Sequence, residues 1–138
     1  MKIIIAGAGD VGFHLAKLLS YESQDTYIID FDGEKLEYLN NHLDVITKKG
    51  DATSIQLLKD IGIDSADLLL AVTDSQNTNF TISVIGKSLG VKKTIARIDN
   101  PEFLKNDEID FKKFGVDFMI SPEELAADEI KMLLNQSS

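Results

Sequence analysis

The stretch GAGDVG, Gly7–Gly12, follows the apolar run Ile3–Ala6 and precedes apolar residues at helical spacing. A G-x-G-x-x-G between a predicted strand and a predicted helix is the context in which three glycines bind a pyrophosphate. Gly7 permits the turn, Gly9 lets the backbone approach the phosphates, and Gly12 lets the helix pack closely. The helix N-terminus adds unpaired N–H groups and partial positive charge. We therefore expect a nucleotide site here rather than a simple turn.

Short apolar strands and amphipathic helices alternate along the rest of the chain. Strands are predicted near residues 3–6, 26–29, 44–47, 67–72, 94–98 and 117–120. The strand at 67–72 is almost wholly apolar, which is typical of a parallel strand covered on both faces. This order predicts an α/β fold, a three-layer doubly wound Rossmann-type domain with a mostly parallel six-stranded sheet. We expect one such domain over residues 1–138, with a helix over 79–89 and a last helix that begins at Ser121 and Pro122.

The composition limits the partners of this domain. The net charge is −9 at pH 7, and the chain has no cysteine. An acidic surface repels nucleic acid and anionic lipid headgroups, so neither is an expected partner. The lack of cysteine excludes disulfides and thiolate metal sites, and it fits a reducing cytosol. No apolar run approaches the ~20 residues that span a bilayer, so we expect no direct membrane insertion.

Polar side chains end the predicted strands. Asp30 ends the second strand, where a carboxylate can accept both ribose hydroxyls of an adenosine and repels a 2′-phosphate. This favours NAD(H), ATP or ADP over NADP(H). Asp51 follows the third strand, where it can bond to the base edge or to its own loop backbone. An Asp or Thr there can also cap the helix that begins near Ser54, and the two roles are compatible. Thr73 and Asp74 follow the fourth strand, at the edge where open α/β sheets bind ligands. Arg97, the single arginine, ends the fifth strand and offers a planar guanidinium to a phosphate or to an ion pair.

Four further residues have weaker signals. Asn77 and Asn79 begin the helix after the fourth strand, where an asparagine suits ligand contact and helix capping equally. His14 and His42 have no Ser or Cys partner and no second His at metal spacing, so we expect surface or packing roles. The sequence therefore predicts no catalytic group and no metal site.

The segments GAGDVG, YIIDFD, GDATS, AVTDSQNTN and ARIDNPEF together resemble one family. They are similar to the N-terminal nucleotide-binding domain of Trk-type potassium uptake protein A, also called the RCK or KTN domain. The resemblance covers nearly the whole chain, with the segments in the family's order. It implies a Rossmann fold that binds NAD or NADH, with ATP or ADP as the alternative. It also implies regulation of K⁺ flux through a membrane partner.

Carried over by position, the resemblance implies a set of nucleotide-binding residues. Those at the phosphates would come from the glycine loop, Asp30 would hold the ribose, Asp51 and Ala52 would line the adenine, and Arg97 would approach the phosphates or a partner subunit. The full set is Gly7, Ala8, Gly9, Asp10, Val11, Gly12, Asp30, Phe31, Asp51, Ala52, Thr73, Asp74 and Arg97.

The resemblance also implies an assembly. Residues 122–135 would form a crossover helix by which two such domains dimerise, so we expect a homodimer or tetramer. It would lie in the cytoplasm, attached to the inner face of the membrane through a K⁺ transporter subunit. Many family members continue into a further lobe, so the chain is either a single-lobe protein or a piece of a longer one.

Two classes of function follow from a nucleotide site. One is a regulatory module, and the other is an NAD-dependent oxidoreductase domain that lacks its substrate domain. The nucleotide domain uses the whole chain, and there is no Tyr-x-x-x-Lys motif to supply a general acid. We therefore expect a protein that is not an enzyme and that senses the nucleotide without consuming it.

Overall fold

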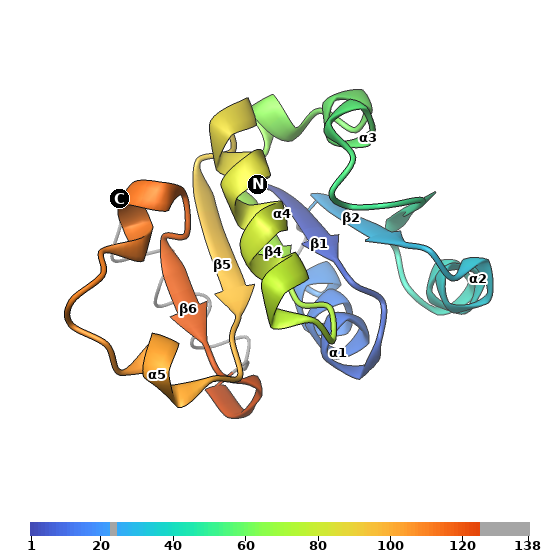
Figure 1. Ribbon diagram of the computed structural model, residues 1–138. Coiled ribbons are helices and arrows are strands. Elements are labelled where there is room, and N and C mark those ends of the chain that lie inside the picture. The colour runs from blue at the N-terminus through green and yellow to red at the C-terminus, as the bar shows by residue number, and fades with distance from the viewer. Residues whose placement is uncertain (23–24, 125–138) are drawn as a thin grey trace.

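The structure is a computed structural model that describes residues 1–22 and 25–124 of the 138-residue chain. Its centre is a six-stranded sheet in the order β3-β2-β1-β4-β5-β6, and every pairing between neighbours is parallel (Figure 1). This is the doubly wound Rossmann order, so the predicted fold class is confirmed. The strands are β1 (Lys2–Ala6), β2 (Asp25–Asp30), β3 (Ile46–Lys49), β4 (Leu68–Ala71), β5 (Lys93–Arg97) and β6 (Phe118–Ile120).

Helices cover both faces of the sheet. On one face lie α1 (Asp10–Ser20) and α2 (Gly33–His42), and on the other lie α3 (Ile55–Asp60) and α4 (Gln76–Leu89). The short helix α5 (Pro101–Leu104) follows β5, beside the outer part of the sheet (Figure 1). Three 3₁₀ turns complete the described elements: η1 (Ile63–Ser65), η2 (Phe111–Phe114) and η3 (Pro122–Glu124). None of the described helices is both long enough and apolar enough to span a membrane.

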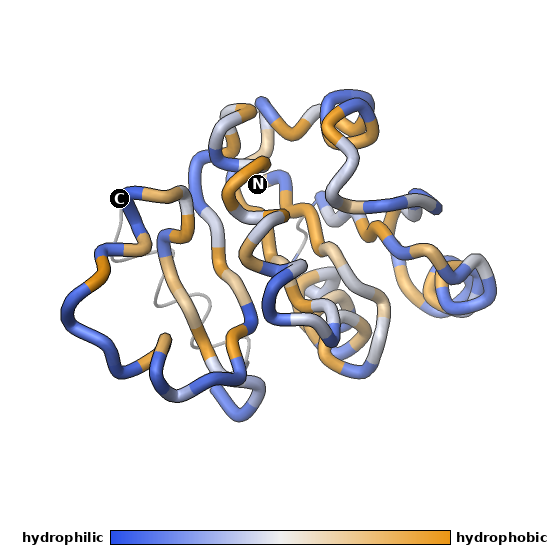
Figure 2. Tube along the Cα trace, in the orientation of Figure 1, coloured by the Kyte–Doolittle hydropathy of each residue, from blue (hydrophilic) through white to orange (hydrophobic). Residues whose placement is uncertain are grey.

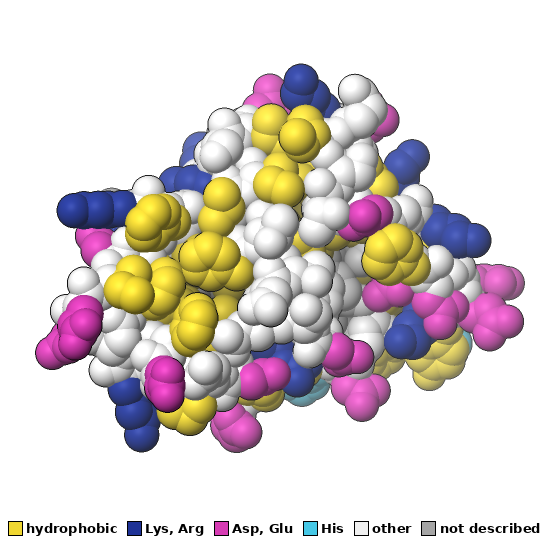
Figure 3. All heavy atoms as spheres, viewed as in Figure 1, with side chains coloured by type: hydrophobic (Ala, Val, Ile, Leu, Met, Phe, Trp, Pro, Cys, Tyr) yellow, Lys and Arg dark blue, Asp and Glu magenta, His cyan; other side chains and the backbone are white. Residues whose placement is uncertain are grey.

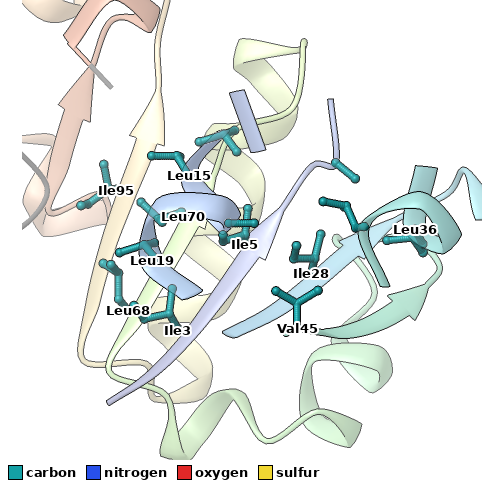
Figure 4. Close-up of a cluster of buried hydrophobic side chains, with 14 of the residues drawn as sticks. Ile3, Ile5, Leu15, Leu19, Ile28, Leu36, Val45, Leu68, Leu70 and Ile95 are labelled. Atoms are coloured by element: carbon teal, nitrogen blue, oxygen red, sulfur yellow. The ribbon is translucent and has the colours of Figure 1, made fainter. Parts of the chain in front are cut away.

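The core consists of two apolar layers on either side of β1 and β4. Ile3, Ile4 and Ile5 are all fully buried because successive side chains point to opposite faces, and both faces are covered. Figure 4 shows Leu15 and Leu19 of α1 beside Ile3 and Ile5 in one of these layers. Figure 2 shows hydrophobic residues along the central strands and hydrophilic residues in many of the connecting segments. The central strands are thus rigid supports for the loops that leave their ends.

A third, smaller cluster lies beyond β5. Its aromatic members are Phe80, Phe103 and Phe111, and the ring of Phe103 stacks on Phe111 at 5.3 Å between centroids. These side chains are only partly buried. Figure 3 shows hydrophobic side chains gathered on this side of the molecule, over β5 and β6 and between α4 and α5.

The bounds of two elements differ from the sequence prediction by two residues or more. The third strand covers Ile46–Lys49 rather than 44–47, because its pairing with β2 extends to Lys49, which lies opposite Asp30. None of its residues is buried, so no apolar pattern marks its bounds in the sequence. Helix α4 begins at Gln76 rather than Asn79, because the Ser75 hydroxyl accepts a hydrogen bond from the Thr78 N–H and caps it.

Of the helix predicted at the end of the chain, the described residues include only the first turn after Ser121. The N–H of Glu124 donates to the backbone carbonyl of Ser121 at 3.0 Å, closing a 3₁₀ turn. The remainder of the predicted crossover helix at 122–135 lies outside the described residues.

Candidate functional site

The glycine loop joins β1 to α1 at the carboxyl edge of the sheet. Gly7 has φ +116°, in the region that favours glycine, and its N–H donates to the carbonyl of Ile29 at 2.9 Å. A Cβ on Gly12 would overlap the carbonyl oxygen of Gly7 and lie 2.8 Å from its carbonyl carbon. In contrast, a Cβ on Gly9 would meet no atom within 4 Å. Two glycines therefore shape the loop, and Gly9 leaves free space above it, as the close approach of a phosphate requires.

Asp30 is bonded to this loop. Its Oδ2 accepts a hydrogen bond from the Ala8 N–H at 2.7 Å, and its Oδ1 accepts one from the Asp32 N–H at 2.8 Å. A carboxylate has about four acceptor positions, so both oxygens can still accept from ribose hydroxyls. Asp32 has a different role, since its side chain accepts from the Glu34 and Lys35 N–H groups and caps α2. Asp30 thus holds the loop in shape from the end of the neighbouring strand.

Two adjoining cavities lie along this edge. The first, of about 340 Å³, lies over the glycine loop between the ends of β1, β2, β4 and β5, and the second, of about 40 Å³, reaches Gly50 and Asp51 beyond β3. Both are lined by Gly7, Asp30, Phe31 and Thr73. Between them they bring together every predicted site residue except Ala8 and Gly12, which belong to the loop itself: Gly7, Gly9, Asp10, Val11, Asp30, Phe31, Asp51, Ala52, Thr73, Asp74 and Arg97.

A wider groove of about 670 Å³ lies on the other side of the loop, between α1 and α2. Phe13 and Tyr38 form its apolar part, and Asp32 and Glu34 are carboxylates that line this groove but not the 340 Å³ cavity. These carboxylates repel an anionic ligand. We therefore place the candidate nucleotide site in the two smaller cavities, although the groove is larger.

The wall opposite the glycine loop is built around Asn79. This side chain is fully buried, and its Oδ1 accepts hydrogen bonds from the N–H and the hydroxyl of Thr73 at 2.8 and 2.6 Å. Its Nδ2 donates to the backbone carbonyls of Thr73 and Arg97, each at 3.0 Å. The residue is inside α4, so capping, one of its two predicted roles, is wrong. It does not line either cavity.

Arg97 lies at the mouth of the larger of the two cavities, with 19% of its side chain exposed. Its Nη1 lies 3.7 Å from Oδ1 of Asp74, and its Nε lies 3.4 Å from Oδ1 of Asp99. Both carboxylates are solvent-exposed, and Asp74 is fully so. The ion pairs that the sequence left as an alternative are therefore present, and the residue also lines the cavity.

The side chain of Asp51 stabilises the loop that follows β3. Its Oδ1 accepts hydrogen bonds from the hydroxyl and the N–H of Thr53, at 2.7 and 2.8 Å. These bonds, the hydroxyl bond first, hold the pKa of the Asp51 carboxyl below its usual value. The cap of α3 is Ser54, whose hydroxyl accepts from the Leu57 N–H, so the capping alternative for Asp51 is wrong.

Sequence reasoning missed one cation of the site. Lys35 lines the 340 Å³ cavity together with Arg97, and these are the two cationic residues among those that line it. Lys35 lies in the first turn of α2, because Asp32 caps that helix. This position shortly after Asp30 is the feature of the sequence that could have identified it as a site residue. Ser75 and Thr78 also line this cavity.

The two histidines lie away from the cavities. His14 is exposed on α1, and His42 stacks on the ring of Tyr38 with 4.0 Å between centroids. Within residues 1–22 and 25–124, no group of three or more His, Cys, Asp or Glu side chains is arranged to hold a metal ion.

Comparison with known proteins connects this geometry to a family. The family model of the TrkA-N domain matches residues 3–122. The Trk system potassium uptake protein TrkA homolog of Archaeoglobus fulgidus is 36% identical over 134 residues, which cover 97% of this chain and 30% of that protein. The Trk system potassium uptake protein TrkA of Haemophilus influenzae is 39% identical over 137 residues, with the same coverage. The chain thus spans about a third of the length of these relatives.

Solved structures give the same picture of the fold. The TrkA-N domain of inner membrane protein ybaL from Escherichia coli superposes with a TM-score of 0.76 at 14% identity, covering 99% of this chain and 96% of that chain. The GsuK RCK domain has a TM-score of 0.70 at 26% identity, covering 99% and 28%. The GsuK channel bound to NAD has a TM-score of 0.73 at 16% identity, covering 86% and 21%. On its family match and its relatives, this chain belongs to the TrkA-N domain family.

Proposed function

We propose that this chain is a nucleotide-binding regulatory domain of a potassium uptake system, which senses NAD(H) and gates a membrane K⁺ transporter. The observation that carries the proposal is the free space above Gly9, next to a cavity bordered by Lys35 and Arg97. Helix N–H groups, two cations and room for a close approach together suit a diphosphate. The names of the relatives supply the link to potassium uptake.

NAD or NADH is the proposed ligand, with ATP or ADP as the alternative. All of these carry an adenosine diphosphate unit, whose phosphates would lie over the glycine loop and whose base would lie near Ala52 in the smaller cavity. The Asp30 carboxylate would bind the ribose and repel the 2′-phosphate of NADPH. The bound NAD of the GsuK channel supports the dinucleotide.

Regulation requires that the nucleotide bind two states of the assembly with different affinity, because a ligand that binds both equally shifts neither. The proposed assembly is a homodimer or tetramer of domains that each cover residues 1–138, joined through residues 122–135. It would act on the cytoplasmic side of the membrane, bound to the transporter. In this role the protein turns over no substrate.

The test is a calorimetric titration of the purified chain with NADH, NAD, ATP, ADP and NADPH, repeated on Gly9→Val. We expect saturable binding of NADH or ATP to the wild type. We expect at least a tenfold loss of affinity in Gly9→Val, since its side chain would occupy the space of the phosphates. The variant should keep the wild-type melting temperature within a few degrees, because Gly9 has φ −75° and an empty surrounding.

The matched control is Gly33→Ala. Gly33 also begins a helix after a strand, and a Cβ there would make only ordinary contacts of 3.6–3.8 Å with the Lys49 side chain. Gly33 lines neither of the two cavities, so nucleotide affinity should stay unchanged. Unchanged affinity in Gly9→Val would show that the pocket is wrong. NAD-dependent turnover of a 2-hydroxy acid or aldehyde by the wild type would favour the oxidoreductase alternative.

A further inference from the structure

Asn79 is one of the few polar side chains that the structure buries completely. A buried amide that lacks partners is costly, so its hydrogen bonds show what it does. An asparagine amide can accept two hydrogen bonds and donate two, and the four bonds to Thr73 and Arg97 use all of them. The orientation of the amide is therefore fixed, since exchanging its oxygen and nitrogen would oppose like groups at the Thr73 N–H and at both carbonyls.

The partners of this amide are the ends of two neighbouring strands. Strand β4 leaves the sheet after Ala71, and the last backbone bond on this path joins the Val72 N–H to the carbonyl of Ala6. From there, both backbone groups of Thr73 are bonded to the side chain of Asn79 instead of to another strand. The same side chain reaches the carbonyl of Arg97, the last residue of β5. One residue of α4 thus ties together the carboxyl ends of β4 and β5.

We propose that Asn79 is the positioning residue of the nucleotide site. This inference rests on the proposed function and deepens it. Thr73 and Arg97 line the 340 Å³ cavity, whereas Asn79 lies behind them and contacts only their backbone and the Thr73 hydroxyl. It therefore acts on a ligand through these two residues. It holds this wall of the cavity in place before the nucleotide binds. The conformational entropy of ordering the wall is then lost during folding and does not weaken binding.

The variant that tests this role is Asn79→Asp. An aspartate has almost the same shape and can still accept from the Thr73 N–H and hydroxyl. When ionised, it cannot donate to the carbonyls of Thr73 and Arg97, and when protonated, as burial favours, it can donate to one of them. The substitution therefore removes at least one of the two donated hydrogen bonds without leaving a cavity.

The matched control is Ser83→Ala. Ser83 lies one turn further along α4, is also fully buried, and donates its hydroxyl to the backbone carbonyl of Asn79 at 2.9 Å. Its removal perturbs the same helix and leaves the four hydrogen bonds of the Asn79 side chain in place. For each variant, urea unfolding gives stability and calorimetric titration gives the dissociation constant for NADH, or for ATP if the wild type prefers it.

We expect Asn79→Asp to weaken nucleotide binding about tenfold or more under conditions where it is fully folded, which is ~1.4 kcal/mol. Ser83→Ala should lose stability and keep its affinity within twofold. If Asn79→Asp does not fold, Asn79→Ala serves the same comparison without introducing a charge. Wild-type affinity in a folded Asn79 variant would overturn the proposal, as would an equal loss of affinity in Ser83→Ala.

A second measurement needs no variant. Hydrogen exchange at the Thr73 amide of the wild type, without nucleotide, should be slow because its N–H is bonded to Asn79. Rapid exchange that becomes slow only with NADH would show that the wall forms on binding, and would overturn the proposal. This outcome is distinct from failure of the proposed function, which a wild type that binds no nucleotide would reveal.

Discussion

The two ends of the parallel sheet carry many of the chain's charged side chains but use them differently. At the amino ends of the strands, Lys2 donates through its Nζ to the carbonyl of Ile61 at 2.7 Å, and the backbone N–H of Lys2 donates to Asp67 at 2.8 Å. Asp67 also pairs with Lys92 at 3.1 Å. At the carboxyl ends, the loops separate and leave the two cavities of the candidate site.

A further contact at the amino ends shows the same tendency. Asp117, just before β6, pairs with Lys87 at 2.8 Å and accepts the Thr94 N–H at 2.9 Å. The side chain of Asp117 is 6% exposed and that of Lys87 is 34% exposed, so the carboxylate is enclosed while its partner reaches the surface. At the amino ends, the polar groups therefore form hydrogen bonds and ion pairs with one another, and these stabilise the fold. The carboxyl ends keep backbone N–H groups and two cations near open space, as ligand sites of open α/β sheets do. Substitutions at the two ends should accordingly separate stability from binding.

The largest effect is expected at Gly12, where one substitution should reduce both stability and nucleotide binding. Gly12→Ala would place a Cβ against the carbonyl of Gly7, and backbone cannot yield as a flexible side chain can. We expect a loss of ~3 kcal/mol in the free energy of unfolding, at the upper end for overpacking. Nucleotide binding should be lost as well. Urea unfolding and titration measure both, and a stability within about 0.5 kcal/mol of wild type, an ordinary surface effect, would contradict this packing.

A smaller effect, on selectivity, is expected at Asp30. Asp30→Asn makes one of the two acceptor oxygens a donor, so it cannot keep both bonds to the Ala8 and Asp32 N–H groups. We expect affinity for NADH to fall about tenfold, the loss of one hydrogen bond to a charged group. Affinity for NADPH should fall less, because the repulsion of its 2′-phosphate also disappears.

The control for this substitution is Asp32→Asn, which alters the cap of α2 without altering either bond of Asp30 to the loop. The ratio of the dissociation constants for NADPH and NADH should change in Asp30→Asn and stay constant in the control. Equal ratios in Asp30→Asn and the wild type would refute the role of Asp30 in selectivity.

The smallest effect is expected at the amino ends, where Asp67→Asn should change stability alone. The bond from the Lys2 N–H, followed by that from Lys92, lowers the pKa of the Asp67 carboxyl from its usual 3.8. A pKa that is lower in the folded state adds stability above the unfolded value, and this is lost as pH falls through the folded value.

We therefore expect Asp67→Asn to be ~1 kcal/mol less stable than the wild type at pH 7, the usual contribution of a hydrogen bond. The difference should stay constant down to about pH 5 and shrink below about pH 4, where the carboxyl is protonated first in the unfolded chain and then, at lower pH, in the folded protein. Nucleotide affinity at pH 7 should not change. Urea unfolding from pH 7 to pH 2.5 gives the first result, and a difference that widens at low pH would have the wrong sign.

The sequence predicted the glycine loop well because its requirements are local. The close packing at Gly12 depends on Gly7 and Ile5, a few residues away. The positive φ of Gly7 is a property of the turn itself, although a Cβ there would also lie 3.0 Å from the backbone of Val72 and Thr73. The alternation of apolar strands and helices likewise predicted the parallel sheet. The nucleotide roles of the thirteen residues remain predictions, although the structure brings most of them to two adjoining cavities.

The role of Asn79 could not be predicted in the same way. It depends on β4 and β5 being neighbours and on the start of α4, which Ser75 sets three residues earlier than expected. Both are properties of the assembled sheet, and in the sequence an asparagine near a helix start also suits a cap. The bounds of β3 were missed for a related reason, since Lys48 and Lys49 are in the strand through pairing with β2 and carry no apolar signal.

Arg97 has a bearing on how quickly such a site could respond. Its guanidinium is already paired with Asp74 and Asp99, so a phosphate that reached it would exchange one anion for another. The gain in binding free energy is then smaller than for an unpaired cation, and Asp74 can pair with Arg97 again when the phosphate leaves. Affinity differences among related complexes reside mostly in the rate of dissociation, so this exchange favours fast release. A sensor with fast release follows a falling nucleotide concentration as promptly as a rising one.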